Sequence, residues 1–138
     1  MIDFHSHVLP KMDDGSRSCA ESAAMLRESY AQGIDILAAT SHFYANENSP
    51  EEFLHRRARS WEQLAAVLTD DMPAIRLGAE VQYFEGICRV REVDLLRLEG
   101  SQVLLLEMPF CAWSDRMVKD VLDLNRRPDY TVLLAHIE

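Results

Sequence analysis

The feature that most constrains this chain is a regular alternation of short apolar runs with segments of helical periodicity. Apolar runs occupy residues 2–8, 34–41, 74–84, 102–108 and 130–137, and helical patterns occupy residues 18–32, 49–70, 87–96 and 114–125. Strands that alternate with helices form a mostly parallel sheet with right-handed crossovers. The order therefore predicts an α/β fold with five parallel strands, within a single domain over residues 1–138.

Helix boundaries are signalled at three positions. Ser18 followed by Glu21 predicts a capping box at the start of the first helix, and Ser49 followed by Glu52 predicts another at the second. Gly33 follows the first helix, where a left-handed cap is common. These signals support the alternating assignment.

Each predicted strand carries a histidine or a glutamate at or near its C-terminal end. On the first strand His5 and His7 are two residues apart, so their side chains point to the same face. Asp13 and Asp14 follow in the next loop and add carboxylate oxygens. The later strand ends supply His42, Glu80, Glu107 and His136. Ligands of α/β proteins gather at this end of the strands.

Seven of these residues converge on one place if the sheet is curved: His5, His7, Asp14, His42, Glu80, Glu107 and His136. Imidazole and carboxylate ligands without thiolate suit Mn²⁺, Fe²⁺ or Zn²⁺. A site with several such ions typically serves hydrolysis, most often at phosphate. The sequence thus favours a metal-dependent phosphoesterase.

Structural explanations exist for each residue alone. Glu80 could form an ion pair with an arginine, Glu107 could face water at a sheet edge, and His136 could belong to a frayed end. Burying a carboxylate in an apolar strand without a partner costs on the order of several kcal/mol of folding free energy. Among the seven residues, Glu80 is therefore the one that most strongly indicates a bound cation or metal. His55 lies on a helix beside arginines and receives no role.

Composition narrows the setting. The formal charge of −9 argues against nucleic acid as a partner, because phosphate backbones are bound by clustered Lys and Arg. The sequence has no apolar run long enough for a membrane span and no N-terminal secretory signal. Cys19, Cys88 and Cys111 have no metal-binding spacing, so we expect reduced thiols in a cytoplasmic protein.

Several segments resemble one family. The opening Met1-Ile-Asp-Phe-His-Ser-His with Asp13-Asp14-Gly15 is similar to the start of the PHP-family phosphoesterases (polymerase and histidinol phosphatase). The chain looks most like the manganese-dependent tyrosine phosphatases of bacterial capsule and exopolysaccharide operons. Further matching segments are Glu21-Ser22, Thr40-Ser41-His42, Gly78-Ala79-Glu80-Val81, Leu106-Glu107 and Ala135-His136-Ile137-Glu138.

The resemblance implies a distorted (β/α)₇ barrel with up to three metal ions, of which this chain would form the five-stranded N-terminal part. By that resemblance His5 and His7 bind one ion, and Glu80 bridges it to a second ion held by Glu107 and His136. Asp14 and His42 contribute to a third. Glu80, His42 and Asp14 would carry catalysis.

The resemblance also implies a substrate, namely phosphotyrosine in the tail of a capsule-regulating tyrosine kinase, cleaved by a metal-bound hydroxide. Two alternatives stay open at this point. One is a phosphatase of small metabolites such as histidinol phosphate, and the other is a truncated, non-catalytic metal-binding module.

Family members continue beyond the position of Glu138 with an arginine and, later, an Asp-x-His metal motif, and neither follows His136 in this sequence. We therefore expect a fragment or a shortened gene product. The fifth strand would then have an open edge, and an open edge favours pairing with another chain. This predicts a homo-oligomer.

Overall fold

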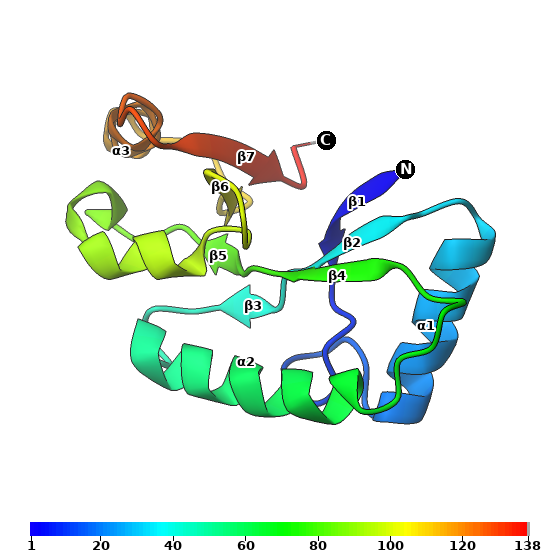
Figure 1. Cartoon of the computed structure of the whole chain (residues 1–138). Coiled ribbons are helices and arrows are strands. Elements are labelled where there is room, and N and C mark those ends of the chain that lie inside the picture. The colour runs from blue at the N-terminus through cyan, green and yellow to red at the C-terminus, as the bar shows by residue number, and fades with distance from the viewer. Residues whose placement is uncertain (138) are drawn as a thin grey trace.

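The computed structural model describes residues 1–137, and within them parallel strands alternate with helices (Figure 1). Each strand pairing in the two sheets is parallel. The predicted parallel α/β class is confirmed. The strands are β1 (Ile2–Ser6), β2 (Ile36–Ala39), β3 (His42–Phe43), β4 (Ala74–Leu77), β5 (Glu80–Gln82), β6 (Val103–Glu107) and β7 (Thr131–Ala135).

The described residues form seven strands where five were predicted, which corrects the expected count. The strand predicted over residues 34–41 is observed as β2 with β3 directly after it, and residues 74–84 form β4 and β5. Hydrogen bonds continue across the breaks, because Gly78 N–H donates to the Ala39 carbonyl at 2.9 Å and Glu80 N–H donates to the Ser41 carbonyl at 3.0 Å. The breaks are therefore bends in two adjacent ribbons.

These bends divide the strands into two sheets, with orders β1-β2-β4 and β3-β5-β6-β7. The side chain of Thr40 contributes to the bend, since its Oγ1 accepts the Ser6 N–H at 3.0 Å. Ribbons that bend in this way curve the assembly, so the C-terminal ends of β1 and β7 approach each other (Figure 1). The rings of His5 and His136 lie 5.0 Å apart across that gap.

Within residues 1–137 the strands β1 and β7 lie at sheet edges, and the arrangement is curved and open. The closed barrel implied by the resemblance is not established by these residues. Pairing across the β7 edge, and the homo-oligomer it implies, stays a prediction that light scattering can test. Glu138, the last residue of the quoted C-terminal motif, lies outside the described residues.

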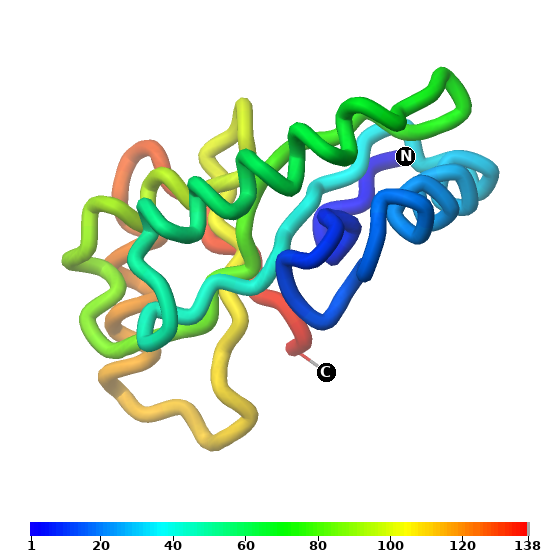
Figure 2. The backbone as a smooth tube through the Cα atoms, turned by 90° about the horizontal axis from the view of Figure 1, so that it is seen from below, coloured from blue at the N-terminus to red at the C-terminus, as the bar shows by residue number. Residues whose placement is uncertain are grey.

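Among residues 1–137 three α-helices connect the strands (Figure 1 and Figure 2): α1 (Cys19–Ala31), α2 (Pro50–Ala65) and α3 (Asp115–Asn125). The predicted capping box of α2 is confirmed, with Glu52 N–H donating to Ser49 Oγ at 3.2 Å and Ser49 N–H donating to Glu52 Oε2 at 2.7 Å. In α1 the box is only half formed, because Glu21 Oε2 accepts from Arg17 N–H instead of Ser18 N–H.

The helix predicted over residues 87–96 is wrong as a single helix. The structure has two 3₁₀ segments there, η1 (Ile87–Arg89) and η2 (Arg91–Leu96). Gly86 precedes them in the left-handed region, and Val90 between them is extended with φ −91° and ψ 108°. An extended residue cannot continue a helical hydrogen-bond ladder, so the segment splits at Val90.

The core lies between the strands and the helices that cover them. Phe53 and Leu64 of α2 are fully buried, and the Phe53 ring packs against Phe43 with centroids 5.6 Å apart. Burying such a side chain stabilises the fold by about 2 kcal/mol. In residues 1–137 the helices are too short or too polar to cross a membrane.

Candidate metal centre

Glu80, the first residue of β5, lies at the centre of a cluster of imidazole rings. Its side chain is completely buried. Four histidine nitrogens approach its two oxygens within 3.3 Å. The distances to Glu80 Oε2 are 2.9 Å from His5 Nε2, 3.0 Å from His7 Nε2 and 3.2 Å from His42 Nδ1, and Glu80 Oε1 lies 3.3 Å from His136 Nε2.

Each of these histidines comes from a different part of the strand-end edge. His5 is in β1 and His7 follows it, His42 begins β3, and His136 directly follows β7. His136 has φ of 51°, in the left-handed region that non-glycine residues rarely adopt. The histidines therefore meet because the sheet curves. The left-handed backbone conformation at His136 turns the chain after β7, where the His136 side chain contacts Glu80.

Three buried polar atoms at the centre of the cluster lack a hydrogen bond of normal geometry. Glu80 Oε1, Glu80 Oε2 and His42 Nδ1 are buried and have no hydrogen-bond partner among the described residues. His5 Nε2 and His7 Nε2 lie 3.1 Å apart and converge on the same oxygen. Buried polar atoms are otherwise nearly always paired. Imidazole nitrogens and carboxylate oxygens that converge in this way fit a bound cation.

The arginine explanation for Glu80 is not supported by the described residues, since the cationic side chains within 4 Å of it are all histidines. Burial raises the pKa of Glu80, but the imidazoles of His5 and His7 outweigh this and lower it to about 2. The carboxylate of Asp13, followed by that of Glu80, raises the pKa of His7 to about 10, so a cation that binds at His7 Nε2 would displace a proton. Glu80 is thus an anion at neutral pH.

Three groups of side chains place their ligand atoms within 4.8 Å of one another: His5, His7 and Glu80; His7, Asp14 and His42; and His42, Glu80 and Glu107. The first and second groups agree with the expected sharing of ligands. In the third, His42 joins Glu80 and Glu107, whereas His136 was expected there. His136 instead contacts the other oxygen of Glu80. All seven predicted residues therefore lie at one edge.

Asp13 holds two of the histidines in position, a role that the sequence alone did not distinguish from that of Asp14. Its Oδ2 lies 2.9 Å from His7 Nδ1 and accepts the His42 backbone N–H at 2.8 Å. Its Oδ1 accepts the Gly15 N–H at 3.0 Å. A carboxylate on the far nitrogen of a histidine fixes the ring so that the other nitrogen faces a metal. The Asp-Asp-Gly sequence after His7 was the available signal.

Tyr44 also borders the cluster and was not singled out by the sequence. Its ring stacks on that of His42, with centroids 5.1 Å apart and planes 18° apart. Burial raises the pKa of Tyr44, as do the nearby carboxylates, Glu107 first among them. Tyr44 is therefore a neutral aromatic wall at physiological pH.

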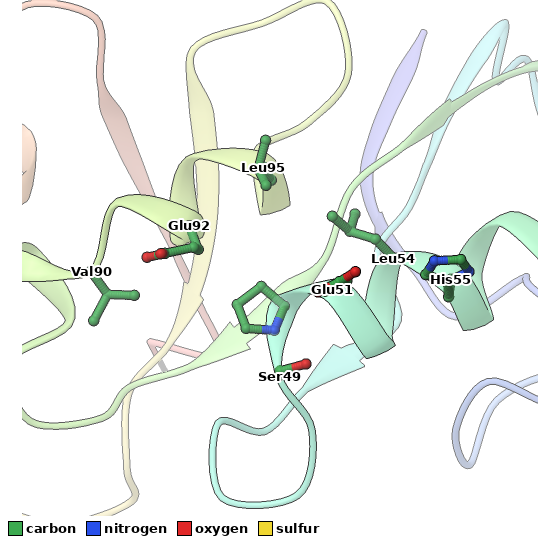
Figure 3. Close-up of a pocket in the computed structure, with 8 residues that line it drawn as sticks. Ser49, Glu51, Leu54, His55, Val90, Glu92 and Leu95 are labelled. Carbon is green, nitrogen blue, oxygen red and sulfur yellow. The ribbon is translucent and has the colours of Figure 1, made fainter.

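A hollow of about 300 Å³ opens beside the cluster. Its lining combines ligand-type residues with an aromatic ring and one cation: Met12, Asp13, Asp14, His42, Tyr44, Glu47, Asn48 and Arg56. A larger hollow of about 640 Å³ lies elsewhere, between α2 and η2 (Figure 3). There Leu54 and His55 of α2 face Leu95 of η2, and none of the seven residues lines it. Size alone does not identify the site.

Comparisons with known proteins agree with this arrangement. The chain is 32% identical over 140 residues to the tyrosine-protein phosphatase CpsB of Streptococcus pneumoniae, covering 100% of this chain and 57% of that protein. It is 34% identical over 113 residues to the tyrosine-protein phosphatase YwqE of Bacillus subtilis, covering 80% and 44%. The chain thus spans about half the length of these relatives.

A solved structure from a study of YwqE and CpsB, described as unique metal-dependent tyrosine phosphatases, superimposes with a TM-score of 0.76 at 28% identity. The match covers 99% of this chain and 55% of that one. The family model described as "Capsular polysaccharide synthesis, CpsB/CapC" matches residues 1–138. A histidine and carboxylate edge on this fold, together with a match over the whole chain, shows that the chain belongs to the CpsB/CapC family of capsular polysaccharide synthesis.

Proposed function

We propose that this chain forms the metal-binding part of a metal-dependent protein-tyrosine phosphatase. The observation that carries the proposal is the fully buried carboxylate of Glu80, on which four imidazoles converge. The names of the relatives support the same activity, although the chain spans about half their length. The reaction class is hydrolysis of a phosphoric monoester.

His5, His7 and Glu80 would hold one cation, and Glu80 would share its second oxygen with a neighbouring ion. His42 belongs to two of the three groups, so it would bind a cation beside Asp14 or beside Glu107. Bound divalent cations would lower the pKa of water and offset charge on the phosphate oxygens. Manganese is our first assignment because the ligands are nitrogen and oxygen only, and Fe²⁺ and Zn²⁺ have compatible preferences.

The chain's own residues would prepare the site before substrate arrives. Asp13 would hold His7 and the His42 backbone in place through its two short contacts. Asp14 is largely exposed, with its side chain at 87%, and its Oδ1 lies 3.8 Å from His42 Nε2. Asp14 would therefore stand at the entrance, where a phosphate monoester meets the cluster.

The substrate we propose is phosphotyrosine in the tail of a bacterial tyrosine kinase of a capsule or exopolysaccharide system. The support is the tyrosine-phosphatase activity for which the relatives are named and the family's link to capsular polysaccharide synthesis. We propose a cytoplasmic location, in keeping with three cysteines that are all free. Hydrolysis of histidinol phosphate is the enzymatic alternative.

A second candidate is a metal-binding module without catalysis of its own. The three groups of ligand atoms lie within the described residues, so metal binding is a property that can be tested apart from turnover. Metal would then bind to the Glu80 cluster without turnover.

The deciding experiment is phosphate release from a phosphotyrosine peptide and from histidinol phosphate by the 138-residue chain, with and without Mn²⁺. We expect manganese-dependent release from the peptide, reduced at least 100-fold in Glu80→Gln and unchanged in Glu62→Gln on the exposed surface of α2. Full metal loading without release from either ester would refute catalysis by this chain and support the module.

A further inference from the structure

The 300 Å³ hollow beside the metal centre has a lining suited to the leaving group of an ester rather than to its phosphate. Ligand-type residues, Asp14 and His42, occupy one part of its wall. The rest of the wall includes Tyr44, Met12 and Arg56, beside the polar side chains of Glu47 and Asn48. If the phosphate of a monoester bound at the metal cluster, its ester group would lie against the part of the hollow formed by Tyr44, Met12 and Arg56, which is aromatic, apolar and cationic.

Tyr44 and Met12 form the apolar part of that surface. Met12 is 7% exposed and belongs to the buried core, so it cannot move aside. The Tyr44 ring is held parallel to His42 by stacking. Aromatic rings pair favourably in offset or edge contacts with other rings. A rigid aromatic wall next to a proposed phosphate site favours an aromatic ester group over an aliphatic one.

Arg56 supplies a fixed positive charge in the same hollow. Its Nη1 donates to Asn48 Oδ1 at 2.8 Å and its Nη2 donates to the Met12 carbonyl at 2.7 Å. Both acceptors are neutral, and among residues 1–137 no carboxylate lies within ion-pair distance of this guanidinium, although Glu47 lines the same hollow. In a chain of net charge −9, this cation would draw an anionic ester toward the site.

We propose that this hollow is a subsite for the aryl group of the substrate, with Tyr44 as the residue that selects aryl over alkyl phosphates and Arg56 as a cation that attracts both. The inference rests on the proposed phosphatase function and deepens it. It predicts that specificity toward tyrosine is located in the segment between β3 and α2 and in the first turns of α2. The metal ligands themselves would not discriminate.

The test compares binding of phenylphosphonate and methylphosphonate, which are not hydrolysed, to the Mn²⁺-loaded chain by calorimetry. We expect phenylphosphonate to bind at least fivefold more tightly. Tyr44→Leu should bring the two affinities within about twofold, in line with the loss of one aromatic pair. Tyr44→Phe should keep the preference, because it keeps the ring.

Arg56→Gln should weaken both phosphonates by a similar factor and leave their ratio unchanged. Arg59→Gln, on the same helix and outside this hollow, is the matched control and should change neither affinity. Metal content is measured for each variant, because Tyr44 also touches His42. In the Zn²⁺-loaded wild type, a nuclear Overhauser effect between the phenyl protons and the Tyr44 ring checks the contact without any mutation.

Three results would overturn the subsite: equal affinity for the two phosphonates, an unchanged preference in metal-replete Tyr44→Leu, or no contact between the phenyl group and Tyr44. Failure of the parent function looks different. A chain that binds phenylphosphonate with the expected preference but releases no phosphate would retain the subsite and lose the catalytic proposal. If the chain hydrolyses aryl and alkyl phosphate esters at equal rates, the catalytic proposal is retained and the aryl subsite is refuted.

Discussion

Oδ2 of Asp13 lies 2.9 Å from Nδ1 of His7, on the side of the ring that faces away from Glu80. The contact occupies one imidazole nitrogen and leaves Nε2 directed at the cluster. Asp13 is thus a positioning residue for a proposed metal ligand. The same oxygen accepts the His42 N–H, so one carboxylate organises two of the histidines.

Replacing Asp13 by alanine should weaken metal binding. Loss of such a supporting carboxylate typically costs 10- to 100-fold in metal affinity, and we expect Asp13→Ala to fall in that range. Calorimetric titration of Mn²⁺ or Zn²⁺ measures the effect, with exposed Asp70→Asn as the control. Wild-type affinity in a folded Asp13→Ala chain would contradict the positioning role.

Gly15 should tolerate no side chain, because a Cβ there would lie 2.3 Å from the His7 carbonyl oxygen and 2.4 Å from His7 Cβ. We expect Gly15→Ala to displace His7, to lower the free energy of unfolding by about 1–3 kcal/mol and to weaken metal binding. Gly78→Ala is the matched control, since its Cβ would meet Thr40 and Leu98 at 3.4 to 3.5 Å. Denaturant titration and calorimetry compare the two, and equal behaviour would refute this packing argument.

Bound metal should stabilise the fold, because ligands from β1, β3, β5 and β6 meet at one place. Cation at 100 times its dissociation constant would add about 2.7 kcal/mol. For a domain of this size that raises the midpoint of thermal unfolding by about 5–10 °C. Differential scanning calorimetry with Mn²⁺ and with excess chelator measures it. Glu62→Gln should respond as wild type does and Glu80→Gln should not, whereas a midpoint unaffected by chelator would argue against an occupied site.

Asp120 of α3 should make stability dependent on acid pH. Burial alone would raise its pKa, but donors from Gly86 N–H, Cys88 Sγ and Tyr83 O–H outweigh burial and hold the pKa below its ordinary value. A depressed pKa contributes stability that is complete above the ordinary value of 3.8 and is lost as pH falls through the folded value. We expect the wild type to lose this contribution in acid.

The variant Asp120→Asn isolates that contribution. At pH 7 it should cost about 2–3 kcal/mol, because buried donors lose a charged acceptor. The difference from wild type should shrink below about pH 4, near the ordinary Asp pKa. Urea titrations between pH 3.5 and 7 measure it. Asp123→Asn, which removes the surface partner of Lys119 and Arg126, should cost less than about 1 kcal/mol. A pH-independent difference would contradict the assigned cause.

The sequence predicted the parallel α/β class and the set of ligand-type residues, because both depend on local pattern. Alternation of apolar runs with helices is readable from spacing, and so is the pair His5 and His7 on one face. The division of β2 from β3 and of β4 from β5 was not readable. It depends on Thr40 and on hydrogen bonds between neighbouring ribbons, which form only after the strands assemble.

Asp13 and Asp14 illustrate the boundary between the two kinds of information. By itself the sequence determined that two carboxylates follow His7, and that His42, Glu80, Glu107 and His136 lie in or next to the later apolar runs. Only the tertiary structure decided that Asp13 turns inward to His7 and His42 while Asp14 points to solvent. It also decided that Glu80, not the opening histidine pair, is the centre of the cluster. The physical reason is that residue spacing along a strand fixes the face of the sheet on which a side chain lies. Curvature of the whole sheet, which forms only on folding, fixes which side chains from different strands come into contact.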